Sequence, residues 1–124
     1  MRVKSLPELD LLEQLIDEGR QWLTVETACT VAADSKQFPV YVLTVGSTDP
    51  NAPALGIFGG IHGLERIGTQ VILSFLHSLV ARLRWDDVLR RQLSEIRLVM
   101  MPLINPGGMA LAVTGVIFVV KQTK

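Results

Sequence analysis

Residues 54–65 read Ala-Leu-Gly-Ile-Phe-Gly-Gly-Ile-His-Gly-Leu-Glu, and this stretch decides the fold of the chain. The apolar run 54–59 predicts a short strand that lies in the interior of its sheet, because both of its faces are apolar. A helical pattern of apolar residues begins shortly after it, at Ile67, and runs to Leu83. His62 and Glu65 therefore lie between the carboxyl end of a strand and the start of a helix, where α/β proteins bind ligands.

His62 and Glu65 are candidate metal ligands. A catalytic zinc ion takes three protein ligands, often His nitrogen or carboxylate oxygen, and a water molecule. The glycines at 59, 60 and 63 allow the backbone to turn both side chains toward one point. A simpler interpretation makes Glu65 an acid favoured by the helix dipole and His62 an ordinary loop residue. The pattern alone leaves both interpretations open.

The rest of the sequence predicts an α/β domain. Its expected elements are a helix over 6–18, strands over 23–33, 38–45 and 55–59, helices over 67–83 and 88–93, and a strand over 96–102. Ser5 and Glu8 have the spacing of a capping box for the first helix. The first two strands form an antiparallel hairpin, whereas the last two are parallel because a helix connects them. Loops 60–65 and 103–108 both follow parallel strands, so both are placed to bind a ligand.

No other residue offers a convincing third ligand. His77, the only other histidine, lies 15 residues beyond His62 (77 − 62), mostly along the predicted helix. At ~1.5 Å per residue this places it on the order of 20 Å away, and we interpret it as a surface residue. Cys29, the single cysteine, is interpreted as a small buried group in a strand. One cysteine excludes an internal disulfide and fits a reducing compartment.

The composition narrows the class of partner. The chain has 124 residues, with 12 basic and 12 acidic side chains and no net charge, so it has no electrostatic surface for nucleic acid or acidic membranes. The amino terminus lacks the apolar run of a signal peptide. The apolar stretch 109–120 is shorter than the ~20 residues of a membrane helix. We therefore expect a cytoplasmic protein.

Two motifs carry a resemblance to a known family. Residues 60–66, Gly-Ile-His-Gly-Leu-Glu-Arg, resemble the His-x-x-Glu zinc motif of the M14 zinc metallocarboxypeptidases. Residues 102–109, Pro-Leu-Ile-Asn-Pro-Gly-Gly-Met, resemble the Asn-Pro-Asp-Gly loop of the same family. The resemblance covers about residues 6–112 and implies a mixed sheet flanked by helices, a phosphorylase/hydrolase-like fold. It also implies a zinc ion held by His62 and Glu65, and hydrolysis of C-terminal peptide bonds.

The sequence also departs from that family. The family's third zinc ligand, a distant histidine, and its general-base glutamate have no counterpart here. Leu64 replaces an arginine of the pancreatic-type enzymes, and Gly107 replaces the Asp of the second loop. We expect residues 1–112 to be the amino-terminal portion of a carboxypeptidase-like domain without its C-terminal half, and 113–124 to be an aberrant apolar tail. The chain is then an inactive fragment with no catalytic residue of its own, and no substrate-binding residue is identified.

Two alternatives stay open. The His-Gly-x-Glu form also resembles the succinylglutamate desuccinylase and aspartoacylase group, which deacylates amino acids on the same zinc fold. The substrate of the full-length relative would then be an acylated amino acid in place of a peptide. The loop 105–108 and the amino-terminal helix with its following hairpin favour the carboxypeptidase branch. The other alternative is a non-catalytic α/β binding or assembly module that self-associates through exposed strand edges.

Overall fold

A long antiparallel hairpin forms the centre of the sheet in the computed structural model, which describes residues 6–62, 66–111 and 120–121. Strand β1 (Thr24–Ala33) pairs with strand β2 (Lys36–Gly46) along almost its whole length. Asp34 and Ser35 connect them with positive φ angles of 48° and 65°. Such a two-residue turn matches the right-handed twist of the strands, which explains the tight hairpin. The predicted hairpin is confirmed.

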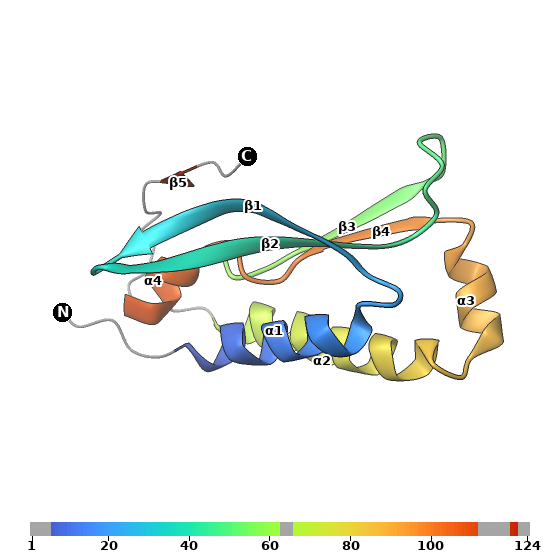
Figure 1. Cartoon of the computed structure of the whole chain (residues 1–124), viewed down its shortest axis with the longest axis horizontal. Helices are drawn as coiled ribbons and strands as arrows, with labels where there is room; N and C mark the ends of the chain where they lie inside the picture. The colour runs from blue at the N-terminus through green and yellow to red at the C-terminus, as the bar shows by residue number, and fades with distance from the viewer. Residues whose placement is uncertain (1–5, 63–65, 112–119, 122–124) are drawn as a thin grey trace.

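The sheet is mixed, and its strand order is β3-β4-β2-β1-β5 (Figure 1). Strand β3 (Ala54–Phe58) runs parallel to β4 (Arg97–Met101), and β4 runs antiparallel to β2. The two-residue strand β5 (Val120–Lys121) pairs with β1. The predicted α/β class with a mixed sheet and a parallel β3–β4 pair is therefore confirmed. The tail predicted for 113–124 lies outside the described residues except for β5, and the boundary at residue 112 stays a prediction.

The predicted interior position of β3 is wrong. Among the described strands β3 is at the edge of the sheet, hydrogen-bonded to β4 alone. Leu55 is 57% exposed and Phe58 is 56% exposed. An apolar run predicts a strand with apolar side chains on both faces, but it does not predict whether other strands pair with both of its edges. Strand β3 is therefore apolar without being enclosed.

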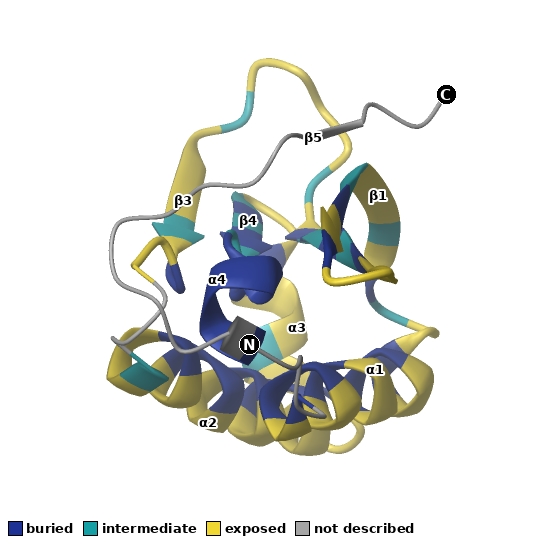
Figure 2. Cartoon of the chain, turned by 90° about the vertical axis from the view of Figure 1, so that its left-hand side faces the viewer, coloured by how far each residue is buried: buried dark blue, intermediate teal, exposed yellow. Residues whose placement is uncertain are grey.

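Two long helices cover one face of the sheet, as Figures 1 and 2 show. They are α1 (Pro7–Gly19) and α2 (Arg66–Leu83), which turn their buried sides toward the strands and toward each other. Side chains from both helices and the inner strands are fully buried in this core, among them Leu12, Leu15, Leu43, Leu76 and Met100. Burial of such side chains contributes ~1.5–3 kcal/mol each, so this layer is the main source of stability.

Helix α2 carries a second apolar stripe that does not face the core. Ile67, Val71 and Phe75 follow one another at spacings of four residues and are exposed. The apolar period of the sequence groups these three residues with Ile72 and Leu76. The structure buries only the latter two, so α2 is apolar on two sides.

The predicted capping box of the first helix is not formed as expected. Leu6 occupies the N-cap position, without a side-chain hydrogen bond, and Pro7 begins the helix. Ser5 lies outside the described residues. The carboxylate of Glu8, which the box would use for capping, binds Arg66 and Gln70 instead. The Glu8 carboxylate therefore binds side chains about 60 residues away in place of a nearby backbone N–H, and a local sequence pattern cannot predict such a contact.

Helix α1 is also tied to the sheet by a polar contact. The hydroxyl of Tyr41 in β2 donates a hydrogen bond to Oε2 of Glu13 at 2.6 Å. Burial, together with this carboxylate, raises the pKa of Tyr41 to about 12. The phenol therefore keeps its proton and its hydrogen bond over the whole physiological pH range.

Two short helices complete the described chain. Asp86 caps α3 (Asp87–Leu93) by accepting a hydrogen bond from the Leu89 N–H, and Asp is a residue type that favours this position. Helix α4 (Pro106–Leu111) begins within the stretch 105–108, which the sequence pattern predicts to be a loop. None of the helices in the described part of the chain is long and apolar enough to cross a bilayer.

Candidate metal centre

The segments that follow β3 and β4 are hydrogen-bonded to each other. The Gly59 N–H donates to the Met101 carbonyl at 3.0 Å, and the Ile104 N–H donates back to the Gly59 carbonyl at 3.0 Å. The Asn105 N–H then donates to the Gly60 carbonyl at 2.7 Å. The parallel ladder thus continues beyond both strands, and the two predicted loops meet at the carboxyl end of the sheet as expected.

Asn105 holds the backbone that leads to His62. The residue is 2% exposed, and its Nδ2 donates to the Ile61 carbonyl at 3.1 Å. Its Oδ1 accepts a hydrogen bond from the Gly108 N–H at 2.9 Å, which is an N-cap contact that starts α4. One buried side chain therefore fixes the residue before His62 and orients a helix. An Asn followed by Pro is the available sequence signal for this cap.

Gly60 is required by the close approach of the two loops. Its φ of +72° lies in the left-handed region that favours glycine. A Cβ at this position would lie 2.5 Å from Oγ1 of Thr69 and 3.1 Å from Cα of Leu103. Thr69 is fully buried and donates to the Pro102 carbonyl at 2.7 Å, so it cannot move aside without breaking that bond. Glycine is therefore the residue that the packing at this position allows.

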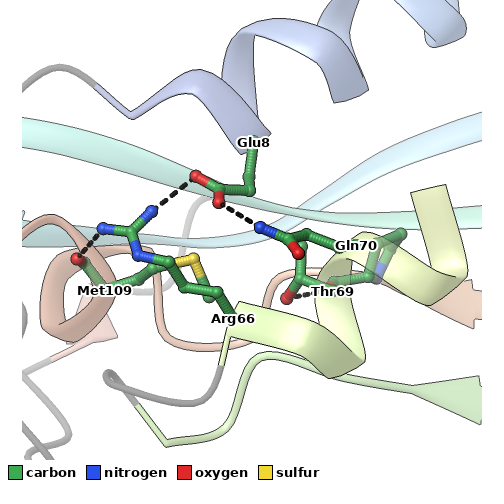
Figure 3. Close-up of polar contacts among 6 residues, drawn as sticks. Glu8, Arg66, Thr69, Gln70 and Met109 are labelled. Carbon is green, nitrogen blue, oxygen red and sulfur yellow. Dashed lines mark hydrogen bonds and ion pairs between the residues drawn. The ribbon is translucent and has the colours of Figure 1, made fainter. Parts of the chain in front are cut away.

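Arg66 anchors the other end of the His62 segment, and sequence reasoning missed this role (Figure 3). Its Nη1 donates to Oε1 of Glu8 in α1 at 2.6 Å, and its Nη2 donates to the Met109 carbonyl in α4 at 2.8 Å. Nε2 of Gln70 donates to the other Glu8 oxygen at 3.3 Å. Three helices meet at this guanidinium, directly after Glu65 in the chain.

Opposing influences act on the Glu8 carboxyl. Burial is the largest of them and raises the pKa of Glu8. Hydrogen bonds from its own N–H, from Arg66 and from Gln70, with the charge of Arg66, together outweigh burial and lower that pKa below its ordinary value. Glu8 is therefore ionised at neutral pH, and the charge of Arg66 is balanced.

His62 is accessible to a metal ion. It is exposed and lines a hollow of about 290 Å³ at the end of β3, together with Gly59, Gly60, Ile67 and Gly68. Glu65, the other predicted ligand, and Leu64 lie outside the described residues. His77 is exposed on α2 and lines a different hollow, beside Glu8 and Leu11, which agrees with its interpretation as a surface residue.

The described residues alone do not complete a metal site. Among residues 6–62, 66–111 and 120–121, no three His, Cys, Asp or Glu side chains are close enough to share an ion. Cys29 is half-buried in β1, and burial raises the pKa of its thiol, which disfavours the thiolate that binds metals. The donors predicted from the motif, an imidazole and a carboxylate, suit zinc, but they are two of the three that a catalytic site needs.

Comparisons with known proteins agree with one another. The family profile for zinc carboxypeptidases, peptidase family M14, matches residues 19–122, so α1 lies outside the matched range except for its last residue. Carboxypeptidase B of Helicoverpa zea is 27% identical over 105 residues, which are 82% of this chain and 24% of that protein. Carboxypeptidase 2 of Trichophyton tonsurans is 27% identical over 95 residues, 73% of this chain and 17% of that protein.

Solved structures show the same fold. A metallo-carboxypeptidase from Burkholderia cenocepacia has a TM-score of 0.65 at 17% identity, over 85% of this chain and 27% of its own. Thrombin activatable fibrinolysis inhibitor has a TM-score of 0.66 at 22% identity, over 89% and 27%. The chain thus spans about a quarter of the length of these proteins.

The Glu8–Arg66 pair predicts a pH-dependent contribution to stability. Because the pKa of Glu8 is lowered in the folded state, its contribution is fully present above the ordinary pKa of about 4.5 and is lost as the pH falls through the folded-state value. At pH 7, Glu8→Gln is expected to lower the free energy of unfolding by about 2 kcal/mol. In urea titrations between pH 7 and pH 3, the difference from wild type should shrink below pH 4.5.

Asp17→Asn is the matched control. It removes the carboxylate of an α1 ion pair with Arg20, in which both side chains are about two-thirds exposed (68% and 69%). Such exposed pairs contribute ~0–1 kcal/mol, so this variant should stay close to wild type throughout the pH range. A Glu8→Gln deficit that is the same at pH 7 and pH 3 would contradict the assignment of the effect to the Glu8 charge.

Proposed function

This chain belongs to the zinc carboxypeptidase family, and on that premise we propose that it forms the amino-terminal part of a hydrolase domain that cleaves C-terminal peptide bonds. The observation that carries the proposal is the family match over residues 19–122, in which His62 follows β3 beside the Asn105 segment. The two relatives from Helicoverpa and Trichophyton are both named carboxypeptidases, which supports a peptide substrate over an acylated amino acid.

His62 and Glu65 would hold the zinc ion in this proposal. The family is zinc-dependent. When bound, zinc would polarise the carbonyl group of the peptide bond to be cleaved and lower the pKa of a bound water molecule. The task of the described residues is to present the His62 ring at the end of β3. Asn105 fixes the backbone carbonyl of Ile61, and Gly60 lets the two loops pack closely.

The 124 residues alone are proposed to be inactive. The sequence has two histidines, and His77 lines a hollow between α1 and α2, apart from the one at His62. Two ligands would leave a zinc ion open to water on several sides. Among the described residues, no carboxylate lines the hollow at His62 to act as a general base. Hydrolysis would need a third ligand and a base that these residues do not provide.

A zinc titration tests the proposed ligand. Isothermal titration at pH 7 should show one weak zinc site in wild type, and His62→Ala should abolish it or weaken it at least tenfold, because it removes one of two donors. His77→Ala is the matched control, since it removes the other exposed imidazole from a different surface. Equal zinc affinity of wild type and His62→Ala would remove His62 from the metal shell.

The same zinc-loaded samples can be assayed with peptides that end in aliphatic, aromatic or basic residues. No release of the C-terminal amino acid above the zinc-only background is expected, because the ligand set is incomplete. Zinc-dependent release that is lost in His62→Ala would contradict the proposal that the 124 residues are inactive alone.

Self-association is a second candidate function, favoured by one specific observation. The exposed apolar side chains of β3 and of the α2 stripe are Leu55, Phe58, Ile67, Val71 and Phe75. Among the described strands, β3 pairs on one side only, so its outer edge is open. An apolar edge strand without charged residues is a template for pairing with another chain. We propose that the isolated chain associates through this side.

Light scattering after size-exclusion chromatography tests the association. The mass of wild type should rise above the monomer value of 13.7 kDa as the protein concentration increases. Val71→Lys should lower the association, because it places a charge in the centre of the exposed stripe. His77→Lys should not, because His77 is exposed on the side of α2 next to α1, about 120° around the helix from Val71. A wild-type monomer at every concentration would exclude this candidate.

A further inference from the structure

We propose that a polar hollow between Glu26 and Arg97 binds a small zwitterion of the dipeptide type, with the ligand carboxylate on Arg97 and the ligand ammonium group on Glu26. The hollow has a volume of about 340 Å³. It lies at the amino end of β4, whereas His62 follows the carboxyl end of β3, which runs parallel to β4. The inference therefore goes beyond the proposed function and does not depend on zinc.

The strands place both charged side chains on one face of the sheet. Leu98 of β4 and Val45 of β2 are buried in the core, and Val25 of β1 packs against it. Because side chains alternate along a strand, Arg97 and Glu26 point to the other face, away from α1 and α2 (Figure 1). Both line the same hollow.

Short side chains leave space between the two charges. Thr24 pairs with Thr44 across the hairpin, and Gly46 pairs with Arg97 across β2 and β4. Gly46 has a φ of +108°, and a Cβ there would lie 2.3 Å from the Ile96 carbonyl oxygen, so no side chain can fill this space. The hydroxyls of Thr24 and Thr44 line the hollow and form no hydrogen bond with a described residue, so both can bind a ligand.

Arg97 is half-buried without an opposing charge. The structure describes two half-buried arginines, Arg66 and Arg97, and Arg66 is paired with Glu8. Arg97 forms no ion pair with any described residue. A guanidinium that is partly removed from water is stabilised by a carboxylate, which it can bind through two parallel hydrogen bonds. The backbone of Arg97 is already fixed, because its N–H donates to the Pro53 carbonyl at 2.8 Å.

Glu26 makes a simple anion a poor ligand and a zwitterion a suitable one. It is exposed and forms no ion pair with a described residue, Arg97 included. Glu26 pairs with Val42 of β2 and Arg97 with Gly46 of β2, so the two charged residues are two strands and four residues apart. At ~4.8 Å per strand and ~3.3 Å per residue, their Cα atoms are on the order of 16 Å apart.

A dipeptide matches this separation of charges. It spans ~7 Å when extended and carries its ammonium and carboxylate groups at opposite ends. Trp22, which packs partly against the core, also lines the hollow and offers an apolar surface to the body of the ligand. Charge complementarity at both ends therefore selects the ligand class.

A set of three ligands tests the proposal on the wild-type chain by two-dimensional NMR at pH 7. Alanylalanine should shift the amides of Gly46, Ser47 and Arg97 with a dissociation constant of about 1–10 mM, because the charged groups are partly exposed. N-acetylalanylalanine lacks the ammonium group and alanylalanine amide lacks the carboxylate, so each should bind at least about fivefold more weakly.

A solvated surface without a binding site predicts no such selectivity. Equal binding of the three compounds overturns the proposal, as does the absence of shifts at these amides up to about 50 mM alanylalanine. Neither result requires a variant, so the test is decisive even if a variant does not fold.

Two variants assign the charges. Arg97→Gln should weaken alanylalanine binding about tenfold and remove its advantage over the amide, whereas Glu26→Gln should remove the advantage over the N-acetyl compound. Arg91→Gln is the matched control, because Arg91 is exposed on α3 and forms no ion pair with a described residue. It should keep the wild-type affinity within about twofold. A folded Arg97→Gln that still prefers alanylalanine to its amide overturns the assignment.

Discussion

The buried side chain and backbone of Asn105 are the constraint on which the site depends. Its N–H and its amide group bind the carbonyls of Gly60 and Ile61, and its oxygens accept from Gly108 and Met109. Without these contacts, the carbonyl of the buried Gly60 would lose its donor and α4 would lose its cap, each at a cost of about 1–3 kcal/mol. Asn105, in the segment after β4, thereby fixes the backbone of the two residues that precede His62.

This arrangement explains how the two segments that follow β3 and β4 are held together. The parallel pair β3–β4 brings both loops to one end of the sheet, and α1 and α2 support them from one face. Arg66 extends the support to α1 through Glu8 and to α4 through Met109. The backbone on both sides of residues 63–65 thus rests on contacts among the described residues.

Local sequence patterns predicted the elements well, because apolar periodicity and capping residues act over a few residues. The hairpin, the parallel β3–β4 pair and the Asp86 cap follow from such patterns. The same patterns misplaced β3 in the interior, since they carry no information about neighbouring strands. They also assigned Glu8 to a capping box and missed its pairing with Arg66, 58 residues away. Asn105 was expected in a loop, although the Pro that follows it is typical of a helix start.

Hydrogen exchange at single amides tests the central claim most directly. The N–H groups of Ile104 and Asn105 donate to the carbonyls of Gly59 and Gly60, so they should open only when the sheet opens. In the metal-free protein, two-dimensional NMR should give these two amides the same free energy of opening as the β4 amide of Leu98, which is in the core. Exchange of Ile104 and Asn105 that is at least a hundredfold faster than that of Leu98 would contradict the account, because the two loops would then separate while the sheet stays folded.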